Sequence, residues 1–436
     1  MPLHADVACL LCGCLCDDLI VETAGNQILH AKHACPIAAR TFRKLNSSRP
    51  SVASRHGAAC SPAEAFSAAA ELLRNSRAPL LFGLRLIETN GHRSAIHLAE
   101  HLGAVIDTAG SPLTRASLLA LHQAGASTCT LGEIRQRGDL IIYWGSDPLR
   151  THPRHIERYS GTPASEFLPG GRADRTLVLI HSAASQTERA ADLAIRITPG
   201  THADVLAALW QLVRDADWQP AVARSLPLDA LRNLAGRIKS CRYGVIFAGE
   251  ELAQGPAASQ ILETLHQFVA ELNGLTRFTI RSMGHSGAET ALTWQTGFPC
   301  AVDFQQGFPR YQPGEFSTEE LLLRKEVDSC VIMGSDSLES LSPAALHVLQ
   351  GLPTIVLDAP HQSCPFTPHV QFTTALPGVQ MAGTAYRMDG VALPLQKLCE
   401  SPYPSAGEVL TTLRELLAPA MAHPVPPGSA GALSPP

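Results

Sequence analysis

The chain places four cysteines within eight residues near its start, at positions 9, 12, 14 and 16, and a fifth at position 35. The spacing Cys9-x2-Cys12-x3-Cys16-x18-Cys35 predicts iron-sulfur ligation, because a four-iron four-sulfur cluster needs four thiolates that converge on a small volume. Zinc is the alternative metal, although a Cys-x2-Cys pair in a zinc site usually has a second close pair. A third interpretation is that the loop has only a structural role and binds no metal. Cys14 is the spare cysteine in each case.

The bulk composition is that of a globular protein with more than one domain. With 436 residues, 45% of them hydrophobic, the chain can bury a sizeable core, and two or three domains are expected. Its 34 basic and 39 acidic residues give a net charge of -5, and no block of Lys and Arg stands out. Nucleic acid is therefore not an expected partner.

Membrane insertion and secretion are not expected either. No apolar run reaches the roughly 18 to 20 residues of a spanning helix, and residues 1–11 lack the cationic and long apolar regions of a signal peptide. Crowded cysteines in a chain of this length are more typical of metal ligation than of a disulfide framework. We therefore expect a cytoplasmic protein.

The residue pattern divides the chain into three parts. Residues 1–50 form a cysteine-rich β unit, with two short strands joined by a hairpin at 24–26. Residues 51–417 alternate short apolar strands with helices, such as a helix expected at 92–103, and this alternation predicts parallel α/β sheets. Residues 418–436 are rich in Pro, Ala, Gly and Ser and are expected to be disordered.

An internal repeat predicts two related units within the α/β part. The segment 139–149, Asp-Leu-Ile-Ile-Tyr-Trp-Gly-Ser-Asp-Pro-Leu, returns at 328–338 as Asp-Ser-Cys-Val-Ile-Met-Gly-Ser-Asp-Ser-Leu. Both copies share an Asp, a four-residue apolar strand and Gly-Ser-Asp, and a second apolar strand follows each of them. We therefore expect two Rossmann-like parallel-sheet α/β domains behind the small N-terminal unit.

The Gly-Ser-Asp turn of each copy is a candidate binding site. Open α/β sheets bind ligands in the crevice beyond the carboxyl ends of their strands, and both turns fall there. The structural alternative is that each glycine only permits a tight turn from strand to helix. The candidate cofactor-binding residues are Gly145, Ser146, Asp147, Gly334, Ser335 and Asp336.

Longer motifs occur along most of the chain, among them Cys12-Gly-Cys-Leu-Cys-Asp-Asp-Leu19, Thr151-His-Pro-Arg-His-Ile-Glu-Arg-Tyr-Ser160 and Gly383-Thr-Ala-Tyr-Arg-Met-Asp389. Together they resemble the B subunit of formylmethanofuran dehydrogenase. This resemblance implies the fold of the molybdopterin oxidoreductases, with a four-iron four-sulfur cluster near the N-terminus. It also implies a molybdenum or tungsten ion held by two pterin-guanine dinucleotides and by a Cys or Sec side chain.

The position that the resemblance assigns to the metal ligand holds a leucine. The family's Ser-Val-Cys-His-Gly-Pro-like stretch falls on residues 111–116, which places Leu113 at the Cys and Thr114 at the neighbouring His. A leucine offers no lone pair to a metal. The resemblance therefore implies a scaffold without its catalytic metal, and the pterin cofactor is expected to be absent. Further departures from the family pattern are His202, Gln380 and Ala382.

A family member of this kind is most similar to the B subunit of the bacterial formyltransferase/hydrolase complex, which converts formyl-tetrahydromethanopterin to formate through a methanofuran-like carrier. The resemblance then implies a structural, redox-inactive subunit without catalytic residues. Its expected partners are the A, C and D type subunits and the formyl carrier on a neighbouring subunit. Two alternatives stay open: an active formylmethanofuran dehydrogenase subunit in which another ligand replaces the lost side chain, and an iron-sulfur scaffold only.

Three further features favour structural explanations. His152 and His155 have the spacing of a metal-binding pair but are expected to anchor a loop. Asp17 and Asp18 are expected to accept hydrogen bonds from local backbone N–H groups. The aromatic Gly/Pro-rich loop at 294–299 is expected to form an interface with a partner.

Overall fold

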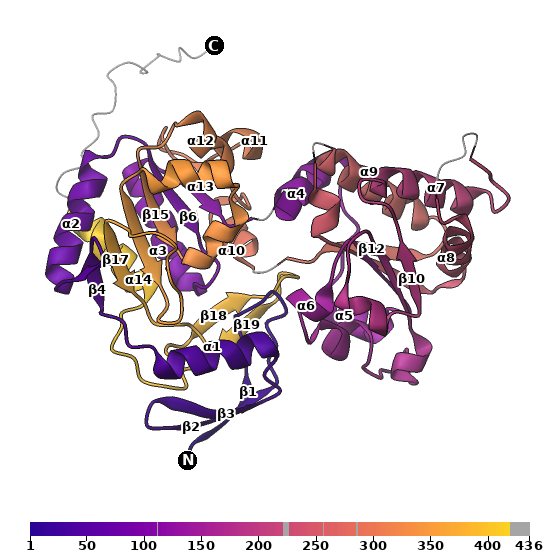
Figure 1. The fold of residues 1–436 in the computed structure, drawn as a ribbon, viewed down its shortest axis with the longest axis horizontal. Helices are drawn as coiled ribbons and strands as arrows, with labels where there is room; N and C mark the ends of the chain where they lie inside the picture. The colour runs from indigo at the N-terminus through magenta and orange to yellow at the C-terminus, as the bar shows by residue number, and fades with distance from the viewer. Residues whose placement is uncertain (111, 221–225, 256, 285–286, 419–436) are drawn as a thin grey trace, which may run out of the picture.

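The computed structural model describes residues 1–110, 112–220, 226–255, 257–284 and 287–418. They form a small N-terminal unit and two lobes that face each other across a gap (Figure 1). Nearly all of the tail expected to be disordered lies outside the described residues. Within those residues, no helix is both long and apolar enough to cross a membrane.

The N-terminal unit is a three-stranded antiparallel sheet in the order β1-β2-β3, packed against helix α1. The hairpin between β2 and β3 turns at Gly25 and Asn26, which both have positive φ, as a two-residue type I′ turn requires. The sequence pattern predicts this hairpin but misses β1, because most side chains of that edge strand are exposed and show no alternation. The elements are β1 (Leu3–Val7), β2 (Leu19–Ala24), β3 (Gln27–Lys32) and α1 (Pro36–Ser47).

The first lobe is built on a nine-stranded sheet whose strands come from both halves of the chain. Its order is β14-β13-β7-β6-β15-β16-β17-β4-β5, and the five strands from β7 to β17 run parallel. Apolar side chains alternate between two cores, one beneath α2, α3 and α14 and the other beneath α12 and α13. The strands are β4 (Ala53–Arg55), β5 (Ala58–Ala59), β6 (Pro79–Gly83), β7 (Val105–Thr108), β13 (Val302–Asp303), β14 (Arg310–Tyr311), β15 (Ser329–Met333), β16 (Thr354–Asp358) and β17 (Val370–Thr373). The helices are α2 (Pro62–Asn75), α3 (Thr89–Leu102), α10 (Ala288–Thr296), α11 (Pro313–Phe316), α12 (Thr318–Arg324), α13 (Pro343–Gln350) and α14 (Ala406–Leu417).

The second lobe holds a five-stranded parallel sheet in the order β10-β9-β8-β11-β12. Helices α4, α7, α8 and α9 cover one face of this sheet, and the N-terminal cysteine loop packs into the core on the other face. The strands are β8 (Leu140–Trp144), β9 (Thr176–His181), β10 (Leu193–Arg196), β11 (Tyr243–Ala248) and β12 (Arg277–Ser282). The helices are α4 (Pro112–Ala124), α5 (Leu131–Arg137), α6 (Pro148–Thr151), α7 (His202–Arg214), α8 (Leu228–Ser240) and α9 (Ala258–Leu272), and a small hairpin of β18 (Gly383–Tyr386) and β19 (Ala392–Leu395) lies near the N-terminal unit (Figure 1).

The two repeat strands, β8 and β15, occupy equivalent positions in their sheets. β8 has β9 and β10 on one side and β11 and β12 on the other, while β15 has β16 and β17 on one side and β6 and β7 on the other. In the first lobe, β6 and β7 precede the repeat strand β15 in the chain. The whole second lobe is inserted between β7 and β13. The prediction of two related parallel-sheet units is therefore confirmed.

Helix α3 begins at Thr89, three residues before its predicted start. The carboxylate of Glu88 accepts hydrogen bonds from the backbone N–H groups of Asn90 and Gly91, which otherwise have no partner in a first helical turn. The glutamate therefore acts as the N-cap, a role more typical of Ser, Thr, Asp or Asn. The sequence pattern misses this start because Asn90 and Gly91 are poor helix formers.

Candidate functional site

The four predicted metal ligands lie together. Cys9, Cys12, Cys16 and Cys35 line one small cavity whose other walls are largely apolar. The loop that carries the first three closes through a hydrogen bond of 2.8 Å from the backbone N–H of Cys9 to the carbonyl of Cys16. Cys35 reaches the cavity from the residue before α1. The donor set and its enclosure fit a group held by four thiolates, as an iron-sulfur cluster is.

The thiols of this loop are strongly perturbed. Burial raises the pKa of Cys16 to about 12, and it also raises the pKa of Cys9 and Cys35, with nearby cysteines adding to the effect. A hydrogen bond with Cys14 lowers the pKa of Cys12 in spite of burial. Because metals bind thiolates, loading of this site must release protons. Among the described residues, no three His, Cys, Asp or Glu side chains are placed to chelate a single ion.

Two arginines of the second lobe hold the cysteine loop. Arg154 donates hydrogen bonds of 2.7 Å to both carboxylate oxygens of Asp18, and Arg158 pairs with Asp17 and Asp18. Burial opposes ionisation of Asp18, but the hydrogen bonds from Arg154 and Arg158 outweigh it and lower the pKa of Asp18 to about 2. The expectation that these aspartates bond the local backbone is therefore wrong, because their carboxylates point at the second lobe.

Replacing Asp18 by asparagine should loosen this attachment. Arg154 is buried and would keep Glu157 as its only charged partner, so we expect a loss of about 1 to 2 kcal/mol, reduced by the solvent that reaches the one-third-exposed Asp18. Because the folded pKa lies below the unfolded value of about 3.9, the stabilisation is present above that value and is lost as the pH falls toward 2. Urea denaturation between pH 7 and pH 3 checks this, and a variant with an unchanged midpoint and acid profile contradicts it.

The loop also packs tightly against the segment that leaves the second lobe. A side chain at Gly13 would place its Cβ 2.0 Å from the carbonyl oxygen of Gly284, so only glycine fits there. The buried His152 lies with its Nε2 2.9 Å from the same carbonyl, and burial lowers its pKa to about 4. His155 is buried against Tyr143, 3.1 Å from its hydroxyl. The prediction that the histidines anchor a loop is therefore confirmed for His152, whereas His155 bonds to a side chain of strand β8 and to Ser160.

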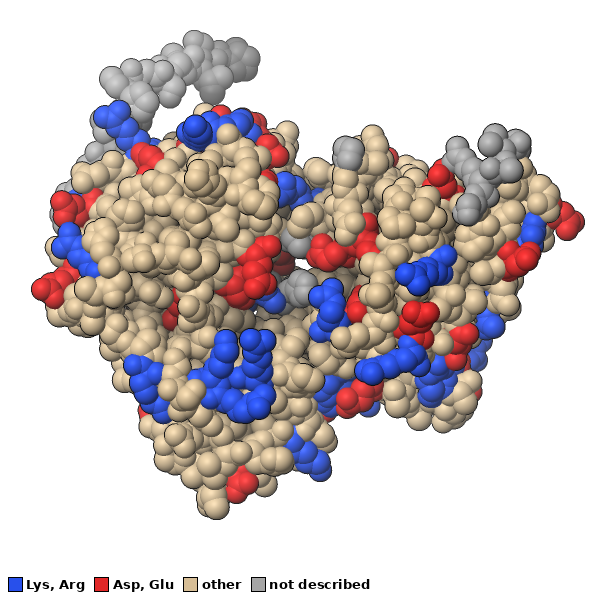
Figure 2. All heavy atoms as spheres, viewed as in Figure 1, with Lys and Arg blue, Asp and Glu red and all other residues tan. Residues whose placement is uncertain are grey.

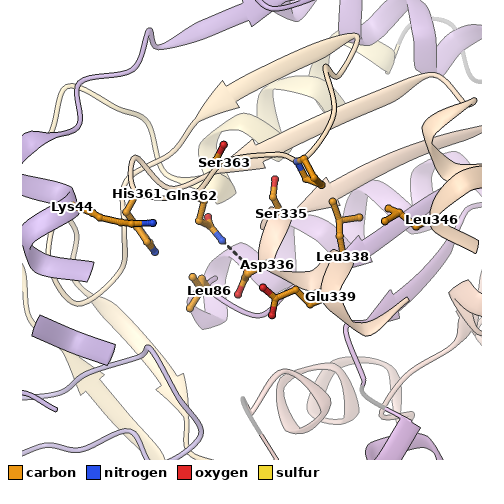
Figure 3. A pocket seen from close by; sticks show the side chains of 11 residues that line it. Lys44, Leu86, Ser335, Asp336, Leu338, Glu339, Leu346, His361, Gln362 and Ser363 are labelled. Carbon is orange, nitrogen blue, oxygen red and sulfur yellow. Dashed lines mark hydrogen bonds between the residues drawn. The ribbon is translucent and has the colours of Figure 1, made fainter. Parts of the chain in front are cut away.

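The Gly334 turn borders an open crevice in the first lobe. The backbone N–H and the hydroxyl of Ser335 donate to Asp358 at the end of β16, at 2.7 and 2.6 Å, which fixes the turn. Asp336 lines a cavity of about 440 Å³ and accepts a hydrogen bond from Gln362 (Figure 3). Figure 3 shows Lys44 and His361 side by side on the α1 side of this cavity. The crevice therefore presents both acidic and basic groups to a ligand.

The equivalent crevice of the second lobe is filled. Glu251 lies over Gly145, accepts hydrogen bonds of 2.7 Å from the backbone N–H and hydroxyl of Ser182, and pairs with His202 at 3.6 Å. Ser146 is buried, and its hydroxyl has no hydrogen-bond partner within the described structure. Asp147 accepts hydrogen bonds from the loop at 186–187. The structure thus places Ser335 and Asp336 of the Gly334 turn at a cavity. Asp147 of the Gly145 turn holds a loop instead.

Sequence reasoning singled out His202 only as a departure from the family pattern, and it missed Glu251. The pairing of the two was not visible because they lie on different elements that meet only in the fold. Arg85 was missed as well, although it follows β6 directly, and it pairs with Asp336 at 3.4 Å. Strand β6 lies beside β15 as β11 lies beside β8, and the acidic residues Glu250 and Glu251 follow β11 where Arg85 follows β6. The two crevices therefore differ in charge.

A third cavity, also of about 440 Å³, lies between the lobes. Its walls combine Asp336 and Glu289 of the first lobe with Glu250 of the second, and Pro112 and Thr114 from the start of α4. This is the place where the chain passes from the first lobe into the second. A ligand held by both lobes would contact it.

Leu113 points away from this cavity. Its side chain is 1% exposed and belongs to the second-lobe core beneath α4 and α9, together with Ala116 and Ala120 on the same face of the helix. The neighbouring Thr114 lines the cavity instead. A buried leucine cannot coordinate a metal, and a threonine hydroxyl is protonated at neutral pH and is no thiolate. The donor set at this position therefore does not fit the family's metal.

Comparison with known proteins places the chain in a family. No model of a known protein family matches it. It is 32% identical over 413 residues to the B subunit of the tungsten-containing formylmethanofuran dehydrogenase 2 of Methanocaldococcus jannaschii, covering 91% of this chain and 94% of that protein. It is also 28% identical over 335 residues to the B subunit of the formyltransferase/hydrolase complex Fhc of Methylorubrum extorquens, covering 76% and 86% of the two chains.

Solved structures agree with these relatives. A chain of the formyltransferase/hydrolase complex FhcABCD from Methylorubrum extorquens, solved with methylofuran, superposes with a TM-score of 0.66 at 25% identity, covering 84% of this chain and 99% of the other. Acetylene hydratase from Pelobacter acetylenicus superposes with a TM-score of 0.68 over 95% of this chain and 69% of its own, at 11% identity, and this likeness concerns the fold alone. The extent and identity of the match to the Methanocaldococcus jannaschii protein show that the chain belongs to the family of formylmethanofuran dehydrogenase B subunits.

Proposed function

We propose that this chain is a structural, redox-inactive subunit of a formyltransferase/hydrolase complex in methanofuran-linked one-carbon metabolism. The observation that carries the proposal is that Leu113, at the position where the resemblance places the family's metal ligand, is buried in a core beneath its helix. The closed second-lobe crevice supports it, since Glu251 occupies the space beside Gly145 where a second dinucleotide would be expected. The chain would then act by holding its neighbours in register.

The similarity to the Fhc B subunit and to a chain of the FhcABCD complex supports this assignment. Both relatives belong to a multi-subunit assembly, and the solved complex contains methylofuran. We infer that this chain likewise assembles with A, C and D type subunits and that a methanofuran-like carrier serves that assembly. The tungsten-containing relatives define the alternative, an active dehydrogenase subunit in which Thr114 or a non-protein ligand takes the place of the thiolate.

Metal and pterin analysis of the purified complex separates these two functions. We expect less than about a tenth of an atom of molybdenum or tungsten per chain and no pterin, because the donor set lacks a thiolate. A tungsten-containing formylmethanofuran dehydrogenase serves as the positive control. Stoichiometric metal with pterin, together with viologen-linked oxidation of formylmethanofuran, would show that the chain is an active redox subunit.

We also propose that the cysteine loop holds a four-iron four-sulfur cluster. The support is geometric: four thiols from two separate segments line one enclosed cavity, and Arg154, Asp18 and Gly13 hold the loop against the rest of the protein. Such a cluster would bind the N-terminal unit to the fold and supply a one-electron carrier when it is bound. Analysis for iron, zinc and acid-labile sulfide distinguishes it from a zinc site.

An exposed aromatic surface favours a partner contact in such a complex. Trp294 is 75% exposed and Phe308 is 55% exposed, and the ring of Phe298 stacks on Tyr311 with centroids 4.9 Å apart. Trp294 lies on α10 and not in the loop expected from the sequence. Exposed tryptophans of this kind are enriched at the centres of protein interfaces.

A further inference from the structure

We propose that the cavity between the two lobes binds an organic cation, with the carboxylates of Glu289 and Glu339 as its counter-ions. The proposal concerns the third cavity described above and needs neither the iron-sulfur cluster nor the role in a complex. It goes beyond the proposed function because it gives this family member a ligand of opposite charge to a pterin dinucleotide.

Charge is the first argument. Among the described residues, four carboxylates line the cavity, those of Glu250, Glu289, Asp336 and Glu339, together with the guanidinium groups of Arg85 and Arg150. Figure 2 shows acidic side chains on both walls of the gap between the lobes. A site with this excess of negative charge repels the phosphates of a dinucleotide and attracts a cation.

The pairing of these groups sharpens the argument. Arg85 is paired with Asp336 at 3.4 Å, and Arg150 lies 3.8 Å from Asp147, a carboxylate outside the cavity lining. Neither Glu289 nor Glu339 forms an ion pair with any residue that the structure describes. A bound ammonium would give the partly buried carboxylate of Glu289 a counter-charge, and the exposed carboxylate of Glu339 would add to the attraction.

A buried hydroxyl points to a ligand independently of the carboxylates. Ser337 lines the cavity, its side chain is 1% exposed, and its Oγ has no hydrogen-bond partner within the described structure. Buried hydroxyls nearly always have a partner. A ligand N–H group inside the cavity would supply one, since a serine oxygen accepts as well as donates.

The size and shape of the cavity favour an organic cation over a bare metal ion. A volume of about 440 Å³ is that of a small-molecule site. Its carboxylates come from opposite walls, and among the described residues no three of them are placed to chelate one ion. A polyamine carries several ammonium groups along a carbon chain and can pair with carboxylates on opposite walls, which a single divalent ion cannot.

The ionisation of Glu289 gives the proposal a pH signature. Burial, with a smaller contribution from Asp107 of β7, raises the pKa of Glu289 to about 7, although hydrogen bonds from its own backbone N–H and from Thr108, and the charge of Arg85, act in the opposite direction. Asp336 also faces the cavity, and burial raises the pKa of that group too. An alkylammonium stays protonated up to about pH 10. Binding should therefore tighten as the pH rises through 7, because the site gains its charge while the ligand keeps its own.

Spermidine is the probe, measured by isothermal titration calorimetry on the full chain. We expect one molecule per chain, binding that tightens between about pH 6 and pH 8, and a loss of about tenfold or more in Glu289→Gln together with a flat pH profile. Glu339→Gln, at an exposed position, is the second variant and should also weaken binding. Glu71→Gln, an exposed carboxylate on α2 far from the cavity, is the matched control and should bind as the unmodified chain does.

Competition defines the results that overturn the proposal. If spermidine binds Glu289→Gln as tightly as the unmodified chain, its binding site lies outside this cavity and the proposal is wrong. Stoichiometric Mg²⁺ that displaces spermidine makes the cavity a metal site, and GMP that displaces it makes the cavity a nucleotide site. Because the Gln substitution removes a carboxylate whose charge burial disfavours, the variant should fold, and Glu339→Gln decides the case if it does not.

Discussion

Replacing Cys16 by serine should remove the iron from the chain. Its thiol lines the same cavity as Cys9, Cys12 and Cys35, and a cluster that loses one of four thiolates loses its closed coordination. We expect iron and acid-labile sulfide to fall from about four atoms each per chain to near zero, with loss of the visible charge-transfer absorption. Because the proposed cluster would tie residues 9–16 to Cys35, the variant should also unfold at lower urea concentration.

Two other cysteines serve as controls for this experiment. Cys60 lies outside the cavity, and Cys60→Ser should leave the iron content unchanged. Cys14 is buried and hydrogen-bonds to Cys12 but is not among the cavity-lining residues, so Cys14→Ser should retain the cluster. An unmodified chain that carries one zinc atom and no sulfide, or no metal at all, would refute the iron-sulfur proposal.

Replacing Asp389 by alanine should destabilise the fold by about 3 to 5 kcal/mol, the cost of removing one partner of a buried ion pair. The side chain of Asp389 is fully buried and accepts two hydrogen bonds of 2.7 Å from Arg387 and one of 2.6 Å from the backbone N–H of Leu131. Arg281, also largely buried, donates to the carbonyl of Met388. Without the carboxylate, two guanidinium groups lose their counter-charge, and the start of α5 loses its acceptor.

The position of Asp389 explains why its loss should also destabilise the cysteine loop. It joins the segment after β18 to the second lobe, while the adjacent Met388 donates its backbone N–H to the carbonyl of Gly13 at 3.0 Å. The cysteine loop should therefore loosen together with this segment. Urea denaturation measures the loss, and Glu400→Ala, which removes an exposed partner of Lys397, is the control that should change little. Equal midpoints for the two variants would contradict this account.

Local sequence patterns predicted the parts of the fold that depend on local physics. The repeat at 139–149 and 328–338 predicted two apolar strands that each end in Gly-Ser-Asp, and both strands are central in parallel sheets. The hairpin at Gly25 and Asn26 was equally visible, since its residue types specify the turn. Strand burial and turn geometry follow from residue type and spacing, which need no knowledge of distant contacts.

Contacts between distant segments were not predictable in this way. Asp18 pairs with Arg154 across 136 residues, and Glu251 meets His202 from another strand end. The sequence also carries no sign that the first lobe is assembled from segments on both sides of the second, which places β6 beside β15. Each of these depends on which elements pack together, and charge or periodicity along one segment does not report it.

The sequence by itself indicated the family through the resemblance of its longer motifs. It also predicted the two related α/β units and the cysteines able to hold a cluster, because hydrophobic period and cysteine spacing carry that information. Only the tertiary structure decided that Leu113 faces a core while Thr114 faces a cavity, that one crevice is open and its equivalent filled, and that the carboxylates of Glu289 and Glu339 line one cavity between the lobes. The physical reason is that a side chain's direction and its partners are set by packing between elements, which residue order along the chain does not encode locally.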